Sequence, residues 1–387
     1  MVKEPNTKPV YLDYQATTPL DPQVLDAMMP YLTNRFGNPH SSTHAYGWEA
    51  DAAVDVAREQ VADLIGASPE DIVFTSGATE SNNMAIKGVM RALKGRRPHM
   101  VTVVTEHKCV LESAHAVTRE GVEVTVLPVA HDGVLDLERL RDAVRDDTAL
   151  VSVMLVNNEI GVIQPLAEIA AIAHAKGAKV HTDAAQAVGK IPVDVGALDV
   201  DLMSISGHKI YGPKGVGALY VRRRPRVPLV PLIDGGGQER GLRSGTLSPA
   251  LCAGLGAACA LAATDLGQER GRIEGMAKRF LDALTGALEG VTLNGSPHAR
   301  YWGNLNICVS GVDGDRLMAG LRRIALSSGS ACASGSGEPS YVLAALGVPD
   351  GLAKSALRIG FGRQTRETEA DFAAREIIDT VRTLRSG

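Results

Sequence analysis

The sequence has no closely paired cysteines, no excess of either charge and no hydrophobic run of membrane-spanning length. Its five cysteines are widely spaced with no C-x-x-C pair, which argues against a disulfide framework or a zinc ribbon and favours a reducing compartment. Lys and Arg number 40 against 44 Asp and Glu, without long blocks of one sign, so nucleic acid and anionic membranes are not expected partners. The longest apolar run, residues 250–263, is shorter than the ~20 residues of a spanning helix and predicts a buried helix.

The first residues also lack the features of a targeting segment. Residues 1–9 contain neither an apolar stretch nor an amphipathic pattern rich in Arg and Ser, which predicts a cytoplasmic protein. The chain has 387 residues, of which 45% are hydrophobic, so it can bury a substantial core. At roughly 150 residues per domain, this length favours two or three domains.

Short apolar runs alternate with helical patterns through the middle of the chain, which predicts an α/β fold around a mostly parallel sheet. The expected strands are residues 100–105, 122–129, 150–156, 179–182, 202–206 and 216–221, and the expected helices are 78–93, 137–144 and 166–175. From about residue 267 the pattern changes to a long amphipathic helix at 270–288, a strand at 304–309, a helix near 314–321 and a last helix from about 368. We therefore expect a large domain over 15–263 and a smaller α+β domain formed by 1–14 and 264–387.

Residues 75–80, Thr-Ser-Gly-Ala-Thr-Glu, are the first candidate for chemistry. They form a Gly-containing turn before a predicted helix, where free backbone N–H groups and the helix dipole favour a phosphate. Taken alone, these residues are more often a simple N-cap, because Ser and Thr are strongly preferred at that position.

A second candidate combines Asp183, at the end of one predicted strand, with the group Ser206, His208 and Lys209 at the end of the next. Ligands of open α/β sheets bind beyond the carboxyl ends of the strands. There a carboxylate can keep a pyridine nitrogen protonated, and an amine can form a Schiff base with an aldehyde. Taken singly, each residue could instead be a turn cap, a solvated lysine or a structural histidine.

The third candidate is Cys332, in a stretch of Ser, Gly and Ala from residue 327 to 337. Small residues predict a mobile surface loop, on which a thiol is open to reaction. A plain flexible linker with an incidental cysteine is the alternative. The other four cysteines lie in apolar or helical contexts that favour burial.

In these motifs the sequence resembles the pyridoxal-phosphate-dependent cysteine desulfurases, which have the type I aminotransferase-like fold. The resemblance runs in order from YLDYQATTP at 11–19, through FGNPH at 36–40, TEHK at 105–108, VNNEIG at 156–161 and GGGQER at 235–240, to LRIGFGR at 357–363. The cysteine segment resembles the long-loop subgroup, which serves iron–sulfur assembly and thiolation.

This resemblance implies a role for each matched residue. Lys209 would bind the pyridoxal phosphate covalently, Asp183 would pair with the ring nitrogen, and His107 would stack on the ring and act as a proton partner of Cys332. Asn158 and Gln186 would contact the ring hydroxyl or the substrate, and Arg358 would clamp the substrate carboxylate. The phosphate would be held by Ala78, Thr79, Ser206 and His208, with Thr246 reaching in from the second subunit of a homodimer.

The implied reaction converts L-cysteine to L-alanine and leaves a persulfide on Cys332 for a sulfur-acceptor protein, either an iron–sulfur scaffold or a thiolation relay. No metal is expected at the cofactor site, and Cys332 is the candidate for a transient iron–sulfur ligand. The alternatives are a selenocysteine lyase or another lyase or aminotransferase on the same fold, and a non-enzymatic sulfur-transfer scaffold. The lyase and aminotransferase alternatives need Cys332 little, and the scaffold binds no cofactor.

Overall fold

The computed structural model describes residues 8–328 and 340–386, and its largest element is a seven-stranded sheet. The strand order is β2-β8-β7-β6-β5-β3-β4, and β8 alone runs antiparallel to the other six strands. The strands are β2 (Ile72–Thr75), β3 (His99–Val103), β4 (Glu123–Leu127), β5 (Thr148–Ser152), β6 (Lys179–Asp183), β7 (Leu202–Ser206) and β8 (Gly217–Val221). The predicted α/β fold with a mostly parallel sheet is confirmed.

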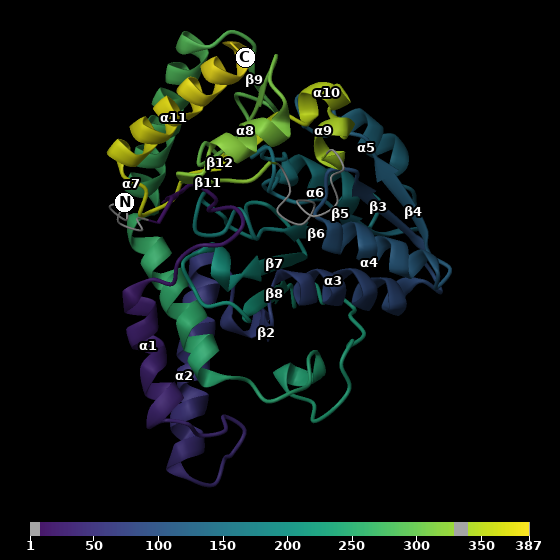
Figure 1. The fold of residues 1–387 in the computed structure, drawn as a ribbon. Coiled ribbons are helices and arrows are strands. Elements are labelled where there is room, and N and C mark those ends of the chain that lie inside the picture. Colours follow the sequence, from purple (N-terminus) through teal and green to yellow (C-terminus); the bar gives the residue numbers. More distant parts are fainter. Residues whose placement is uncertain (1–7, 329–339, 387) are drawn as a thin grey trace.

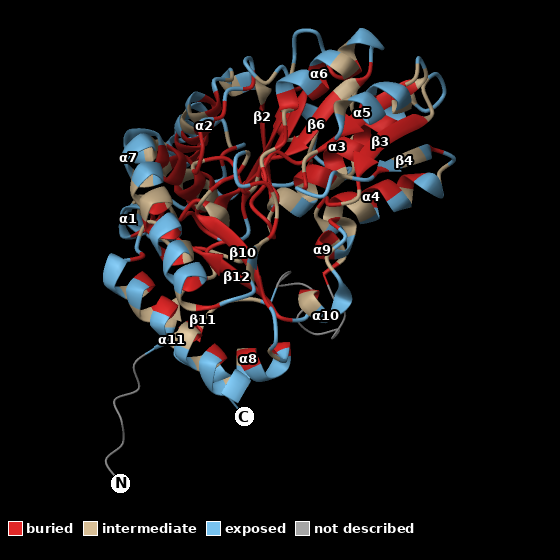
Figure 2. Cartoon of the chain, turned by 90° about the horizontal axis from the view of Figure 1, so that it is seen from above, coloured by how far each residue is buried: buried red, intermediate tan, exposed pale blue. Residues whose placement is uncertain are grey.

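Helices cover both faces of this sheet (Figures 1 and 2). Successive side chains of a strand point to opposite faces, so buried strands present apolar side chains to the helices on both sides. Ile72 and Phe74 pack with the helices of one face, and Val73 packs with those of the other. The first face carries α2 (Ala45–Ile65), α5 (Leu137–Ala143), α6 (Leu166–Ala175) and α7 (Pro249–Ala287), and α1 (Pro22–Thr33) packs on α7. The second face carries α3 (Ala78–Leu93) and α4 (Lys108–Thr118).

A separate small core is built mainly from C-terminal residues. Its three-stranded antiparallel sheet has the order β12 (Ala356–Gly360), β10 (Asn304–Val309) and β9 (Val291–Leu293). The other elements here are β1 (Val10–Tyr11) paired with β11 (Ile324–Ala325), and the helices α8 (Gly314–Gly320), α9 (Tyr341–Ala345), α10 (Asp350–Ala353) and α11 (Glu367–Ser386). Leu12 is fully buried in this core, so the N-terminal segment packs with the C-terminal part. The exact domain limits stay a prediction.

One continuous helix, α7, passes through both cores. The sequence predicts two helices, at 250–263 and 270–288, but the structure has a single helix of 39 residues. The polar residues between them do not end it: Thr264 does not cap a new helix, and its Oγ1 donates back to the Leu261 carbonyl at 2.8 Å within the same helix. By length and composition α7 could cross a membrane, but 44% of its most apolar window is buried inside the protein, where its residues pack in the large core.

Candidate active site

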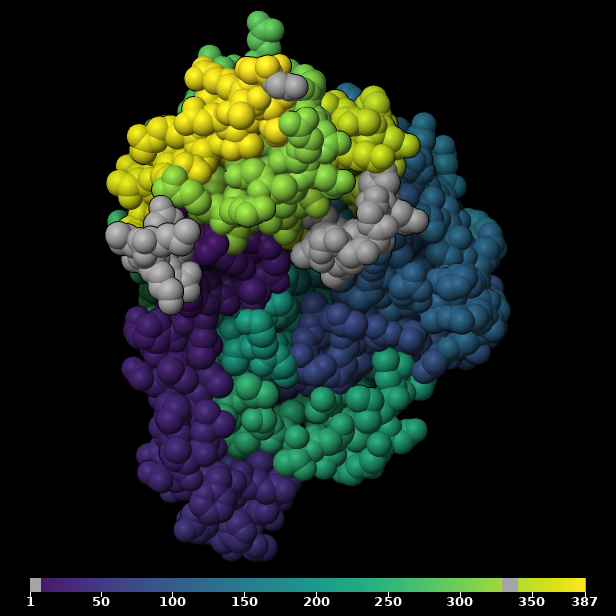
Figure 3. Space-filling view, in the orientation of Figure 1, coloured from purple at the N-terminus to yellow at the C-terminus, as the bar shows by residue number. Residues whose placement is uncertain are grey.

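A cavity of about 440 Å³ lies at the carboxyl ends of the central strands. The C-terminal part lies above the residues of the large sheet in the space-filling view (Figure 3), and Arg358 of β12 reaches the cavity from that side. The cavity brings together most of the predicted site residues, namely Ala78, Thr79, His107, Asn158, Asp183, Gln186, Ser206, His208, Lys209 and Arg358. Thr246 is exposed and does not line this cavity, and Cys332 lies outside the described residues.

The N-terminus of α3 opens onto the cavity. Its N-cap is Gly77, with a φ of 144°, so no side chain caps the first amides. A Cβ built on Gly77 would meet no described atom within 4 Å, so the space before the helix is open. Glu80, which also lines the cavity, pairs with Arg243 at 2.8 Å, and despite burial the bonds from Arg243 and Ser76 lower the pKa of Glu80.

Asp183, the last residue of β6, is 5% exposed and has both oxygens fixed. Asn82 Nδ2 donates to one oxygen at 2.7 Å, and the Ala185 N–H donates to the other at 2.9 Å. The carboxylate is therefore held rigidly at the wall of the cavity, where it can accept one more donor such as a pyridinium N–H.

Lys209 follows β7 in a single 3₁₀ turn, Gly207–Lys209. Its Nζ donates to the carbonyl oxygens of Gln15 at 2.5 Å and Ala16 at 2.7 Å. These carbonyls belong to a segment almost 200 residues away in the chain, so the position of the amine depends on the tertiary fold. Beside it, burial and the charges of Lys209 and Lys214 lower the pKa of His208 to about 4, so this imidazole is neutral at pH 7.

His107 is the N-cap of α4, and its Nδ1 accepts the backbone N–H of Cys109 at 3.2 Å. Burial, together with the charges of Lys209 and Lys108, lowers the pKa of His107. The neutral ring therefore carries its proton on Nε2, because Nδ1 is occupied as an acceptor. The Cys109 thiol, 3.0 Å from Nδ1, has its pKa raised to about 12 by burial and by Asp183, so it is not a nucleophile.

Arg358 is 2% exposed and pairs with Asp13 at 2.8 Å. Its Nη2 also donates to Ser327 Oγ at 3.2 Å, while its buried Nε has no hydrogen-bond partner among the described residues. Asp13 lies within one of the quoted motifs, but no local signal gives it a role, since its partner is 345 positions away. The pair holds the guanidinium in a fixed orientation at the cavity wall.

The cavity residues fit pyridoxal phosphate. The uncapped amides of α3 suit a phosphate, Asp183 suits a pyridinium nitrogen and Lys209 supplies an amine. Asn158 Oδ1 is buried without a hydrogen-bond partner among the described residues, and such an orphaned atom requires a partner from a ligand or water. Over the same part of the chain, no group of three or more His, Cys, Asp or Glu side chains is placed to hold a metal ion.

Comparison with known proteins agrees with this fit. Residues 10–372 match the aminotransferase class-V family, so the chain belongs to this pyridoxal-phosphate-dependent family. The protein named cysteine desulfurase of Mus musculus is 57% identical over 378 residues, which cover 98% of this chain and 82% of the mouse protein. Cysteine desulfurase IscS of Rickettsia rickettsii (strain Iowa) is 52% identical over 380 residues, 98% and 93% of the two chains. A solved structure titled as a NifS-like protein superposes with a TM-score of 0.90 at 36% identity and covers 97% of this chain and 100% of its own.

Proposed function

We propose that this protein is a cysteine desulfurase that uses pyridoxal phosphate to convert L-cysteine to L-alanine and passes the sulfur to an acceptor through Cys332. The observation that carries the proposal is the convergence of Lys209, Asp183, His107 and Arg358 on one cavity. These four side chains come from separate elements of both cores. Near-full-length similarity to proteins named cysteine desulfurase supports the same function.

The chain's own residues bind and orient the reactants. When bound, pyridoxal phosphate supplies an aldehyde for amines and an electron-withdrawing ring. Asp183 holds a proton on the ring nitrogen, and the α3 amides with Ser206 and His208 hold the phosphate. Arg358 binds the substrate carboxylate, and the Lys209 amine takes the proton from the substrate α-carbon.

Sulfur transfer needs the thiolate of Cys332. This sulfur attacks the sulfur of L-cysteine, so that an S–S bond forms while the substrate C–S bond breaks. The bonding electron pair goes to carbon, which gains a proton and leaves as alanine, and the enzyme keeps a persulfide. His107, which lines the cavity, serves as the proton partner of Cys332 in this proposal.

A homodimer would complete the site. Thr246 is exposed in the single chain. In the proposed homodimer it reaches the phosphate site of the second subunit. Large apolar side chains are also exposed on α1, α2 and their connection, namely Leu25, Met29, Leu32, Phe36, Tyr46, Trp48 and Val56. A surface of this kind favours burial against another chain.

The remaining parts of the proposal concern the acceptor and the compartment. We place the enzyme in the cytoplasm, with an iron–sulfur scaffold or a thiolation relay protein as acceptor and Cys332 as a transient iron–sulfur ligand. Cys109, Cys252, Cys259 and Cys308 are free thiols, as a reducing compartment requires.

The test is a paired measurement of products. Purified protein with pyridoxal phosphate, L-cysteine and a thiol reductant should give alanine and sulfide in equal amounts. Cys332→Ser should abolish both, whereas Cys252→Ala, which removes a buried thiol on α7, should retain them. Sulfide accompanied by pyruvate, or activity that survives Cys332→Ser, would instead indicate another lyase on the same fold.

A further inference from the structure

A second lysine, Lys190, lies behind the active-site cavity. It is 8% exposed and sits in the connection that follows β6. Its Nζ donates to Gln186 Oε1 at 2.6 Å, and Gln186 itself lines the cavity. The ring of Tyr301 lies 5.9 Å from the same ammonium, at the outer limit of a cation–π contact.

Lys190 is poorly compensated as a charge. Among residues 8–328 and 340–386, no carboxylate forms an ion pair with it; the cations Lys209 and Arg358 act on it more strongly than the single opposing charge of Glu269. Burial, with these two charges, holds the pKa of Lys190 well below its usual value. A buried lysine without a counter-ion destabilises a fold, and an apolar side chain of similar volume would be more favourable. Stability therefore does not explain this residue.

The hydrogen bonds of Lys190 fix the orientation of the Gln186 amide. Lys190 Nζ donates to Gln186 Oε1, so the carbonyl oxygen of Gln186 faces Lys190. At the other end, Gln186 Nε2 donates to the Gln15 carbonyl at 2.9 Å. With Oε1 turned toward Lys190 and one Nε2 hydrogen bound to Gln15, the second N–H of Gln186 remains for the cavity, a donor suited to an anionic oxygen.

The same Gln15 carbonyl also accepts from Lys209 Nζ at 2.5 Å. A continuous chain therefore runs from Lys190 through Gln186 and Gln15 to the amine of Lys209. Movement of the Gln186 amide would change the donors around this carbonyl, and thereby the surroundings of Lys209.

We propose that Lys190 is a positioning residue, which acts through Gln186 to aim a hydrogen-bond donor at an anionic oxygen of the bound cofactor and to hold the Gln15 carbonyl in place. The inference rests on the cofactor site of the proposed function, but it does not depend on which reaction follows binding.

The first test measures cofactor binding by the full-length apo-protein. Lys190→Met keeps the length of the side chain and removes its donor, and Lys176→Met is the matched control because Lys176 is exposed on the opposite end of the sheet. We expect pyridoxal phosphate to bind Lys190→Met about tenfold more weakly, with the melting temperature of the apo-protein unchanged or higher. A lower melting temperature with unchanged cofactor affinity would show a purely structural role and overturn the proposal.

A double-mutant cycle with Gln186→Leu tests whether Lys190 acts through Gln186. Gln186→Leu alone should weaken cofactor binding, and adding Lys190→Met should weaken it no further. Additive losses would show that Lys190 acts by another route and would refute the proposal. Cofactor absorbance is the readout of the whole cycle, so a failure of the desulfurase reaction would leave its result intact.

Discussion

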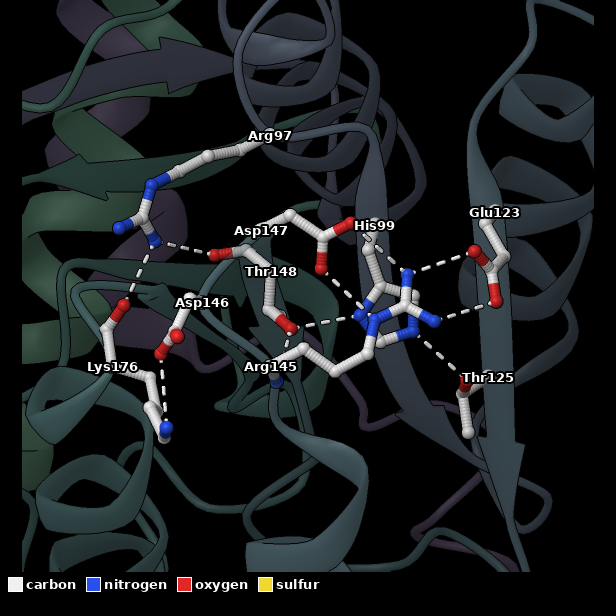
Figure 4. A network of polar contacts seen from close by, with 9 residues as sticks. All are labelled: Arg97, His99, Glu123, Thr125, Arg145, Asp146, Asp147, Thr148 and Lys176. Atoms are coloured by element: carbon white, nitrogen blue, oxygen red, sulfur yellow. Dashed lines mark hydrogen bonds and ion pairs between the residues drawn. The ribbon is translucent and has the colours of Figure 1, made fainter.

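The two ends of the parallel strands differ in whether their polar and charged side chains have partners within the protein. At the amino ends (Figure 4), Arg145 donates to both oxygens of Glu123 at 2.8 Å and also pairs with Asp147 at 2.9 Å. Both ring nitrogens of the buried His99 contact threonine hydroxyls, those of Thr148 at 2.7 Å and Thr125 at 2.9 Å. Every charge drawn there has a local partner or faces solvent.

At the carboxyl ends, several buried polar atoms have no hydrogen-bond partner among the described residues. They include Asn158 Oδ1, Arg358 Nε and Glu106 Oε2, all on or beside the cavity wall. Burial and the nearby Asp183 raise the pKa of Glu106 well above its usual value, which disfavours the charged form of this carboxyl.

This difference indicates that the amino ends of the strands contribute to stability and the carboxyl ends to function. Satisfied groups at the amino ends add a little to the stability of the fold, whereas unsatisfied groups at the carboxyl ends lower stability and are available to a ligand. Changes at the carboxyl ends should therefore act on activity, and changes at the amino ends on stability.

Lys209→Ala should have the largest effect. We expect the rate of alanine formation to fall by at least about 10³-fold, because the variant lacks the amine that binds the cofactor and moves the α-proton. The melting temperature of the apo-protein should change little, since Lys209 is only half-buried. Activity measured beside thermal unfolding checks both parts, and a marked loss of stability would break the contrast between the two ends.

Arg358→Lys should have an intermediate effect. Lysine keeps the charge but cannot offer two parallel donors to a carboxylate, so the KM for L-cysteine should rise roughly 10- to 100-fold, with a smaller change in kcat. Steady-state kinetics of the holoenzyme measure this split. An unchanged KM would mean that Arg358 serves only its pair with Asp13.

His174→Gln, at the amino ends, should have the smallest effect. The hydrogen bond with Asp201, at 2.8 Å, raises the pKa of His174. The protonated His174 therefore stabilises the fold fully below the pKa of about 6.5 that it has in the unfolded chain, and this stabilisation is lost as the pH rises through the pKa of His174 in the folded protein. At pH 6 the variant should melt about 1–3 °C below the parent, and the gap should shrink by pH 9. Thermal unfolding across this range checks the sign, with desulfurase activity unaltered; a gap independent of pH would contradict it.

The regular elements were predictable wherever local pattern decides them. The sequence predicts β7 at 202–206, β10 at 304–309, α3 at 78–93 and α6 at 166–175 with the bounds that the structure has. Strand ends elsewhere differ by a few residues; β5, expected at 150–156, is Thr148–Ser152, although Val153 and Leu155 still donate to the His181 and Asp183 carbonyls of β6 at 3.0 Å. Periodicity describes the buried run, but not where pairing stops.

Contacts between distant segments could not be predicted in this way. The sequence motifs identify Lys209 and Asp183, but not the carbonyls of Gln15 and Ala16 that hold the amine, nor Asn82, which holds the carboxylate. Such partners have no local signature, because any backbone carbonyl or buried amide can serve.

The continuous helix α7 also fixes the distance and the rotation between the two cores. A helix advances ~1.5 Å and turns ~100° with each residue, so one residue inserted near Gly267 would rotate the small core against the large sheet by more than a quarter of a turn. Arg358 would be carried out of the cavity with it. The number of residues in this exposed middle stretch is therefore constrained by an active site that it never touches, and α7 should tolerate substitutions there far better than insertions or deletions.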